Sequence, residues 1–207
     1  MKQEDLDLFT QWAHEAGKSG LVKCSSGNLS QRLDDGTMLI SASGSWLSSI
    51  KTDEIAHISI SEDLVLNTLK PSAEYRFHRE IMCKRPEMNT VLHFQSLSAT
   101  TIACMDLIPD YNIIIEVPIY IGRVGFVPFL PPGSVELAKA IAERILRSDL
   151  VQLANHGQVV CGASYREVIQ KALFFELACS ILLKSNFKAR AIPADQIDRL
   201  REYIKNK

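Results

Sequence analysis

Apolar residues recur every three to four positions in several parts of the chain, which is the pattern of amphipathic helices. The first such segment covers residues 4–19, where Leu6, Phe9 and Trp12 share a face, and Gly20 ends it. Ser72 is placed to cap a second helix. The helices expected after the first cover residues 73–84, 98–105, 131–147, 164–184 and 194–205.

Shorter apolar or alternating runs predict strands between these helices. The runs lie just after residue 28 and at residues 37–41, 56–60, 91–95, 113–119, 124–128, 151–154 and 159–161. Residues 34–36, Asp-Asp-Gly, have the composition of a hairpin turn. Because the order lacks regular strand–helix–strand alternation, it predicts a single three-layer α/β/α domain over residues 1–207, with a mainly antiparallel, mixed central sheet.

The overall composition narrows the class of partner and the compartment. The formal net charge is −1, which gives no electrostatic indication of nucleic-acid or anionic-membrane binding. No apolar run approaches membrane-spanning length, and residues 1–5 lack the apolar core of a signal peptide. The five cysteines are scattered and form no CxxC pair, which fits a reducing cytosol. We therefore expect a soluble, cytoplasmic protein with a small-molecule partner, and no nucleic acid or membrane.

Side chains that could bind a metal lie close to two of the expected strands. His93 and Gln95 are two positions apart in one strand, so both side chains point to the same face. His156 follows the apolar run at 150–154, and Glu74 lies at a helix start. Either histidine alone is more simply a structural residue satisfied by backbone groups. Together the four residues favour an open catalytic site for a divalent metal.

Three short loops rich in serine and glycine form a second candidate site. They are Ser25-Ser26-Gly27-Asn28, Ser43-Gly44-Ser45 and Pro71-Ser72, the last at a helix start. Backbone amides, hydroxyl groups and a helix N-terminus can together bind a phosphate. Any one of these loops is most simply an ordinary turn.

His78 lies one helical turn after Glu74, so it could orient that carboxylate. A position on the helix surface is the simpler expectation.

Six segments of the chain, in this order, resemble the class II aldolase/adducin family. They are residues 25–30, 41–44, 71–78, 85–96, 131–138 and 153–157, within a resemblance from about residue 5 to 185. The fuculose- and rhamnulose-phosphate aldolases of that family are the nearest in function. The resemblance implies a zinc ion, a sugar-phosphate substrate and a ring-shaped homotetramer with active sites between neighbouring subunits.

The resemblance also assigns roles to single residues by position. Glu74 corresponds to the acid/base carboxylate, and His93 and His156 to two metal ligands. The phosphate-binding positions fall on Asn28, Ser43, Gly44 and Ser72, with Ser25 beside them.

The chain departs from the family pattern at three positions. Gln95 stands where the family has its third metal-binding histidine, and a glutamine carbonyl is a weaker ligand than imidazole. Metal affinity should therefore fall, or selectivity should shift from Zn²⁺ towards Mn²⁺ or Co²⁺. Ala73 replaces a second phosphate-binding serine found in some aldolases. The tyrosine proton donor aligns near Ile113, which leaves Tyr111 and Glu116 as candidates for that role.

These implications predict a metal-dependent aldolase that cleaves a ketose 1-phosphate into dihydroxyacetone phosphate and an aldehyde, through a metal-stabilised enediolate. A sugar-phosphate dehydratase or 4-epimerase on the same scaffold is one alternative. A non-catalytic, adducin-like binding domain is the other, and Gln95 could mark such a loss of chemistry. The joint presence of Glu74, His93, His156 and the phosphate loops favours an enzyme.

Overall fold

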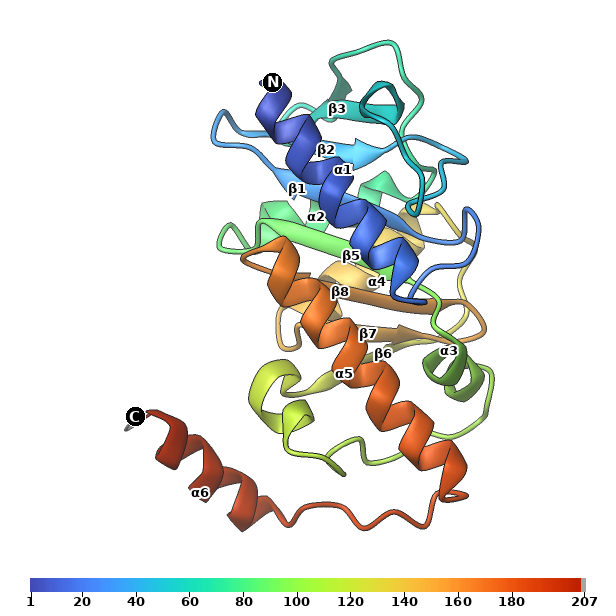
Figure 1. Cartoon of the computed structure of the whole chain (residues 1–207), viewed down its shortest axis with the longest axis vertical. Coiled ribbons are helices and arrows are strands. Elements are labelled where there is room, and N and C mark those ends of the chain that lie inside the picture. Colours follow the sequence, from blue (N-terminus) through green and yellow to red (C-terminus); the bar gives the residue numbers. More distant parts are fainter. Residues whose placement is uncertain (206–207) are drawn as a thin grey trace.

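The computed structural model describes residues 1–205, and its centre is an eight-stranded sheet (Figure 1). Within these residues the strands are β1 (Asn28–Arg32), β2 (Thr37–Ser41), β3 (Ile55–Ser59), β4 (Leu64–Val65), β5 (Thr90–Phe94), β6 (Val124–Val127), β7 (Leu150–Leu153) and β8 (Gly157–Gly162). Their order across the sheet is β4-β3-β2-β1-β5-β8-β7-β6. β6 and β7 pair in parallel and the other neighbours pair antiparallel, which confirms the predicted mixed sheet.

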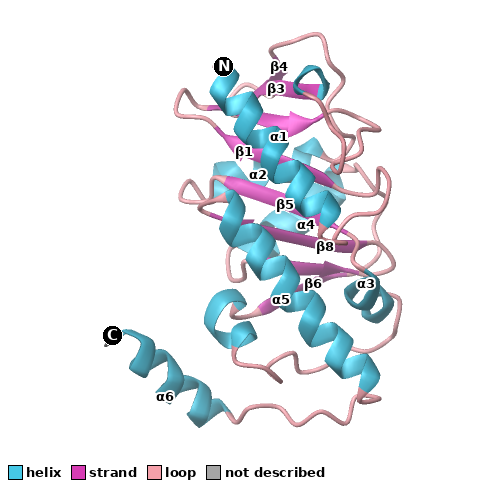
Figure 2. Ribbon diagram, viewed as in Figure 1, coloured by secondary structure: helices cyan, strands magenta, loops and turns pink. Residues whose placement is uncertain are grey.

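Helices cover both faces of the sheet and make three layers (Figures 1 and 2). On one face lie α1 (Gln3–Lys18), α3 (Leu97–Ala103) and α5 (Tyr165–Lys184), and on the other lie α2 (Tyr75–Lys84) and α4 (Val135–Ile145). Alternation along β5 supplies both cores, because Leu92 and Phe94 pack towards α5 while Val91 packs towards α2 and α4. His93 therefore points to the α2 side of the sheet.

Serine caps define where two of the predicted helices begin. The Ser134 hydroxyl accepts a hydrogen bond from the Leu137 amide at 3.1 Å, and Ser164 accepts one from Glu167 at 3.3 Å. The helix expected from residue 73 begins later, at Tyr75. There the Ser72 hydroxyl accepts from the Glu74 amide at 3.3 Å, so Ser72 holds the turn before the helix.

The strand expected at residues 113–119 is absent from the described structure, and this prediction was wrong. Turns lead instead into a five-residue π-helix, η2 (Val117–Ile121). Pro118 has no N–H to donate to a sheet neighbour, and the Gly122 amide closes the helix by donating to the Val117 carbonyl at 2.8 Å. An apolar run alone does not distinguish a buried helix from a buried strand.

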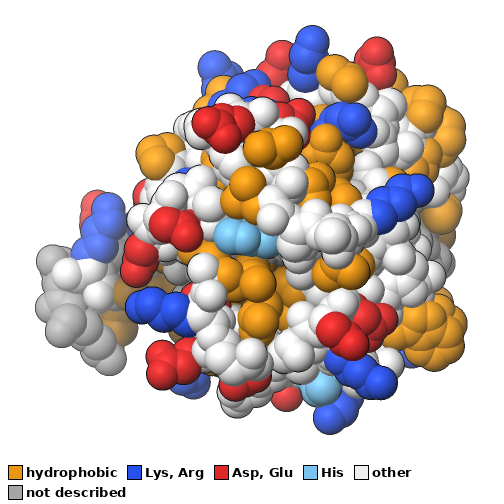
Figure 3. All heavy atoms as spheres, turned by 90° about the horizontal axis from the view of Figure 1, so that it is seen from above, with side chains coloured by type: hydrophobic (Ala, Val, Ile, Leu, Met, Phe, Trp, Pro, Cys, Tyr) orange, Lys and Arg blue, Asp and Glu red, His pale blue; other side chains and the backbone are white. Residues whose placement is uncertain are grey.

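The remaining elements lie at the margins of the sheet. A short 3₁₀ helix, η1 (Thr52–Glu54), precedes β3, and α6 (Ala194–Lys205) follows a long loop and lies apart from the three layers (Figure 2). No helix in the described part of the chain is both long and apolar enough to cross a membrane. On the face shown in Figure 3, acidic and basic side chains are interspersed, in line with the small net charge.

An ionic cluster around the buried Lys171 joins α5 to the end of α2 and the start of β7. The Lys171 side chain is 4% exposed, and its Nζ lies 2.6 Å from the Glu167 carboxylate and 2.8 Å from that of Asp149. Arg85 approaches the other oxygen of Asp149 at 2.6 Å. Three segments of the chain therefore depend on one carboxylate, that of Asp149.

Acid should weaken this cluster before it affects the apolar core. Burial opposes ionisation of Asp149, but hydrogen bonds from Lys171 and Arg85 outweigh it and lower the pKa of Asp149. A lowered folded-state pKa stabilises the protein above the unfolded value of about 3.9, and that contribution is lost as the pH falls through the folded value. Denaturant unfolding between pH 7 and pH 3 should therefore show a steeper loss of stability below about pH 4 in the wild type than in Asp149→Asn. Equal slopes would contradict this origin.

Candidate metal centre

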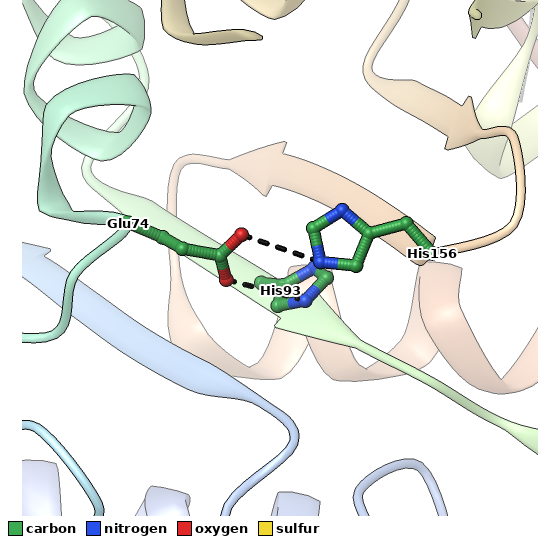
Figure 4. A group of neighbouring side chains, drawn as sticks. All are labelled: Glu74, His93 and His156. Carbon is green, nitrogen blue, oxygen red and sulfur yellow. Dashed lines mark ion pairs between the residues drawn. The ribbon is translucent and has the colours of Figure 1, made fainter. Parts of the chain in front are cut away.

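Three side chains from distant parts of the chain converge at one end of the sheet (Figure 4). Glu74 immediately precedes α2, His93 lies near the end of β5, and His156 lies in the turn between β7 and β8. The Glu74 carboxylate oxygens lie 3.4 Å from His93 Nε2 and 3.3 Å from His156 Nε2. All three potential ligand atoms lie within 4.8 Å of one another. The structure thus brings together three of the four predicted metal ligands.

The turn before β8 positions His156. Asn155 has a left-handed backbone with φ of 54°, which asparagine adopts more readily than most residues. Gly157 is required by close approach, because a Cβ there would lie 2.6 Å from the Phe94 carbonyl oxygen and 3.2 Å from His93 Cε1. The Asn-His-Gly sequence is therefore explained by backbone geometry as well as by the imidazole.

The tautomer of His93 follows from its surroundings. Its Nδ1 lies 2.9 Å from the Gln158 carbonyl oxygen, which can only accept, so Nδ1 carries the hydrogen. Phe77 meets the same ring edge-on at 5.9 Å between centroids. His93 Nε2 is buried with no hydrogen-bond partner and faces Glu74. A metal-binding histidine is commonly oriented in this way.

The unsatisfied atoms at the centre fit a divalent cation. Glu74 Oε1 and His93 Nε2 are buried without hydrogen-bond partners, although both are acceptors. Burial lowers the pKa of His156 to about 4 despite the opposing effect of the Glu74 carboxylate, so this ring is neutral at pH 7. Acceptors that face one another without a donor are costly when buried. A cation between them would satisfy all three groups, and two imidazoles with one carboxylate form an established ligand set for such ions.

Gln95 lies beside this cluster. Gln95 follows β5 directly, and its backbone N–H donates to the Leu21 backbone carbonyl at 3.0 Å. A Cβ placed on Gly157 would be 2.7 Å from Gln95 Cγ and 3.2 Å from His93 Cε1, so both side chains pass the same point. The role of Gln95 as a fourth ligand stays a prediction.

Gln95→His tests that role directly. If Gln95 is a weak ligand, the substitution replaces it with an imidazole, which binds zinc more strongly. The Zn²⁺ affinity should then rise by about tenfold or more, the scale on which changes to metal-binding residues and their neighbours commonly act. Isothermal titration of the metal-free protein measures the change. Gln31→His, on β1, is the control and should leave the affinity unchanged. An unchanged affinity in Gln95→His would place residue 95 outside the coordination sphere.

His78 is not on the helix surface, so that expectation was wrong. It is fully buried, with Nε2 2.5 Å from Asn28 Oδ1 and Nδ1 2.7 Å from the Ser30 hydroxyl. Asn28 in turn donates from Nδ2 to Glu74 Oε2 at 3.0 Å. Burial lowers the pKa of His78 well below its usual value, so the ring is neutral. The i, i+2 spacing of Asn28 and Ser30 places both side chains on one strand face, but it does not indicate that His78 packs against that face.

The predicted phosphate loops lie at the same end of the sheet. A backbone bridge between Ala42 and Pro71 joins two of them, and the Ser43 amide donates to the Lys70 carbonyl at 2.9 Å. Ser43, Gly44 and Ser25 are exposed, while Ser72 is buried. Gly27 is buried, and a Cβ there would lie 2.7 Å from the His93 carbonyl oxygen. The three loops are thus neighbours of Glu74, and their binding of phosphate remains a prediction.

Tyr111 and Glu116 lie elsewhere in the molecule. The Tyr111 ring packs on Phe175 of α5 at 4.9 Å between centroids, in the core on the opposite face of the sheet from Phe77. Burial raises the pKa of Tyr111 above its usual value. Glu116 precedes η2 and is half-buried. Their roles in proton transfer stay predictions.

Comparison with known proteins places these features in context. Residues 8–183 match the sequence profile of the class II aldolase and adducin N-terminal domain. A 3-oxo-tetronate 4-phosphate decarboxylase of Pectobacterium atrosepticum is 32% identical over 186 residues, covering 87% of this chain and 85% of that protein. An L-fuculose phosphate aldolase of Haemophilus influenzae is 32% identical over 171 residues, covering 82% and 78%. The crystal structure of YgbL from Escherichia coli, provisionally described as an aldolase, epimerase or decarboxylase, has a TM-score of 0.90 at 27% identity, covering 96% of this chain and 98% of that one.

Proposed function

This chain belongs to the class II aldolase and adducin family, and from that membership we propose that it is a divalent-metal-dependent lyase that breaks a carbon–carbon bond in a small phosphorylated hydroxyketone. The observation that carries the proposal is the cluster of Glu74, His93 and His156, in which Glu74 Oε1 and His93 Nε2 are buried acceptors without a partner and fit a cation. An adducin-like binding role would give these atoms no common purpose.

We propose a 3-oxo acid phosphate as the substrate, and decarboxylation as the reaction. Relatives named 3-oxo-tetronate 4-phosphate decarboxylase are 30–33% identical to this chain. In such a substrate the carboxylate is two carbons from the ketone, with a hydroxyl on the carbon between them. Loss of CO₂ moves the bonding electron pair onto that carbon and the ketone oxygen. A proton then adds to the carbon, and dihydroxyacetone phosphate is the product.

The residues of this chain divide that work among them. Asn28 holds one oxygen of Glu74 by a hydrogen bond, which leaves Oε1 to take a proton from water and pass it to the carbon that loses CO₂. The Gln158 carbonyl keeps His93 in the tautomer whose Nε2 faces the centre. A divalent cation held by His93, His156 and Glu74 would supply Lewis-acid stabilisation of negative charge on oxygen. The loops at Ser43–Gly44 and Ser72 would bind the phosphate.

Aldol cleavage of a ketose 1-phosphate is the second candidate. It is favoured by the 32% identity to an L-fuculose phosphate aldolase. The two substrates share the fragment from phosphate to ketone to hydroxyl carbon, so the same residues would serve both. Aldol cleavage also requires a base for the hydroxyl of the departing aldehyde. Decarboxylation needs no such group, and this agrees with the position of Tyr111 in the core.

The oligomeric state and the identity of the metal are also part of the proposal. We propose a homotetramer of single-domain subunits with sites between neighbours, and Zn²⁺ as the metal, with Mn²⁺ or Co²⁺ as substitutes because of Gln95. Size-exclusion chromatography with light scattering and elemental analysis test these points.

The two reactions are separated by what leaves with dihydroxyacetone phosphate. The protein, loaded in turn with Zn²⁺, Mn²⁺ and Co²⁺, is offered 3-oxo-tetronate 4-phosphate and L-fuculose 1-phosphate. Equimolar CO₂ and dihydroxyacetone phosphate from the first substrate are the expected result. If only L-fuculose 1-phosphate reacts, and an aldehyde is released, the reaction is aldol cleavage and the decarboxylation proposal is wrong. Product from neither, in a protein shown to bind metal, would count against a carbon–carbon lyase.

A further inference from the structure

A chain of hydrogen bonds runs from β1 to α2, returns to β1 and ends on the Glu74 carboxylate. Its members are Ser30, His78 and Asn28, of which the first two are fully buried and the third is 6% exposed. None of the three is a candidate metal ligand. The line joins the interior of the sheet to one oxygen of the metal centre.

The donor and acceptor of every hydrogen bond in this line follow from the Glu74 carboxylate at its end. A carboxylate only accepts, so Asn28 must present its Nδ2 to Glu74 Oε2, which turns its Oδ1 towards His78. Oδ1 also only accepts, so His78 Nε2 carries the hydrogen. In the neutral ring Nδ1 is then an acceptor, and the Ser30 hydroxyl donates to it.

We propose that His78 is a positioning residue of the metal centre, which acts through Asn28 to fix the direction of the Glu74 carboxylate. Without the His78 donor, the buried Asn28 carbonyl would lack a partner, and the amide could rotate. Rotation would set the Asn28 oxygen against the Glu74 oxygen, where two acceptors repel. Glu74 would then leave the position in which it faces His93 and His156.

The same line gives Asn28 two tasks. An amide nitrogen carries two hydrogens, and Glu74 takes one of them. The other is left for an acceptor on the substrate, which accords with the predicted phosphate role of Asn28. This point rests on the proposed function, whereas the positioning of Glu74 does not. Substrate binding and carboxylate direction would thus share one side chain.

His78→Met and His78→Gln form the matched pair that tests the proposal. The two side chains have nearly the same size, but only glutamine keeps an N–H for Asn28. We expect His78→Met to bind Co²⁺ about 10-fold to 100-fold more weakly, as losses of groups that orient ligands usually do. His78→Gln should recover most of that loss. Co²⁺ titration followed by its visible absorption, without substrate, measures both the affinity and the ligand geometry.

A double-variant cycle shows whether His78 acts through Asn28. If it does, His78→Met combined with Asn28→Ala should bind Co²⁺ no more weakly than Asn28→Ala alone, because the second change removes an interaction already lost. If the fold-losses of Co²⁺ affinity in the two single variants multiply in the double variant, the proposal is overturned. Ile81→Val, a buried change in the same helix, is the control for loosening of α2 and should leave the affinity unchanged.

Two further outcomes keep the test decisive. Equal Co²⁺ affinity in wild type and a folded His78→Met would overturn the proposal. If His78→Met does not fold, Ser30→Ala replaces it, and loss of the donor to Nδ1 should still weaken Co²⁺ binding at least about twofold; an unchanged affinity would overturn the proposal. Because Co²⁺ binding is measured without substrate, failure of the proposed lyase activity would leave this result standing. With substrate, His78→Met should lower kcat more than it raises KM.

Discussion

Glu74→Gln is expected to lower kcat by about 10²-fold to 10⁴-fold, the usual contribution of a positioned acid or base, while the fold is kept. Glutamine has the same shape, and its carbonyl can still accept the hydrogen bond that Asn28 gives to Glu74. It has no carboxylate to carry a proton or to balance the charge of a cation. Turnover is measured at saturating metal with 3-oxo-tetronate 4-phosphate, and circular dichroism verifies the fold.

The control for this variant lies in α2, the helix that follows Glu74. Glu80→Gln removes a carboxylate that pairs with Arg79 at 3.6 Å, away from the metal centre, and should leave kcat unchanged. Metal content separates the two tasks of Glu74, because His93 and His156 remain and should retain the ion with lower affinity. Full activity of Glu74→Gln would remove Glu74 from proton transfer.

Lys171→Met is expected to be the most destabilising single change outside the apolar core. The ammonium is nearly fully buried and bonds to Glu167, Asp149 and the Cys161 carbonyl. Removing one partner of a fully buried ion pair costs about 3–5 kcal/mol, and we expect the lower end of that range here, because the Asp149 and Glu167 side chains are 27% and 38% exposed and water screens their charge. In a chain of this size that corresponds to a fall in Tm of about 10 °C. Calorimetry or thermal unfolding followed by circular dichroism measures it.

A matched surface lysine shows that burial is the cause. Lys139→Met, on the exposed side of α4, changes the same chemical group and should shift Tm by no more than about 1 °C, as typical surface substitutions do. The pair Lys171→Met with Asp149→Asn should lose less stability than the two single losses together, because the two side chains share one interaction. Additive losses would show that Lys171 stabilises the protein without Asp149.

The helices and most strands could be predicted because local signals agree with the final fold. Ser134 and Ser164 are N-cap residues that mark where two helices begin. The segments that form β5, β7 and β8 are apolar and end in turn residues. The segment at 113–119 failed for a physical reason. Its apolar side chains pack into the core on the α5 side, as a buried strand would, but Pro118 and the turn after Asp110 direct the backbone into a π-helix.

The site was predictable in kind but incompletely in detail. The sequence identifies Glu74, His93 and His156 as residue types suited to a metal, and the fold brings them within ligand distance. The buried role of His78 could not be read from its helix alone. It depends on β1, where Asn28 pairs with His93 and Ser30 lies two residues further on the same face. That register is a property of the sheet and not of any local pattern.

The wide separation of the three ligands along the chain has a consequence for biosynthesis. Glu74 and His93 belong to the first half of the chain, whereas His156 lies in the hairpin between β7 and β8, and β8 in turn pairs with β5. A chain emerging from the ribosome N-terminus first can place the first two, but it cannot complete the centre until β8 joins the sheet. Until then Glu74 and His93 form an incomplete and weaker chelate. Ion acquisition would therefore be a late event in maturation, and an ion bound at that stage would hold the two halves of the sheet together.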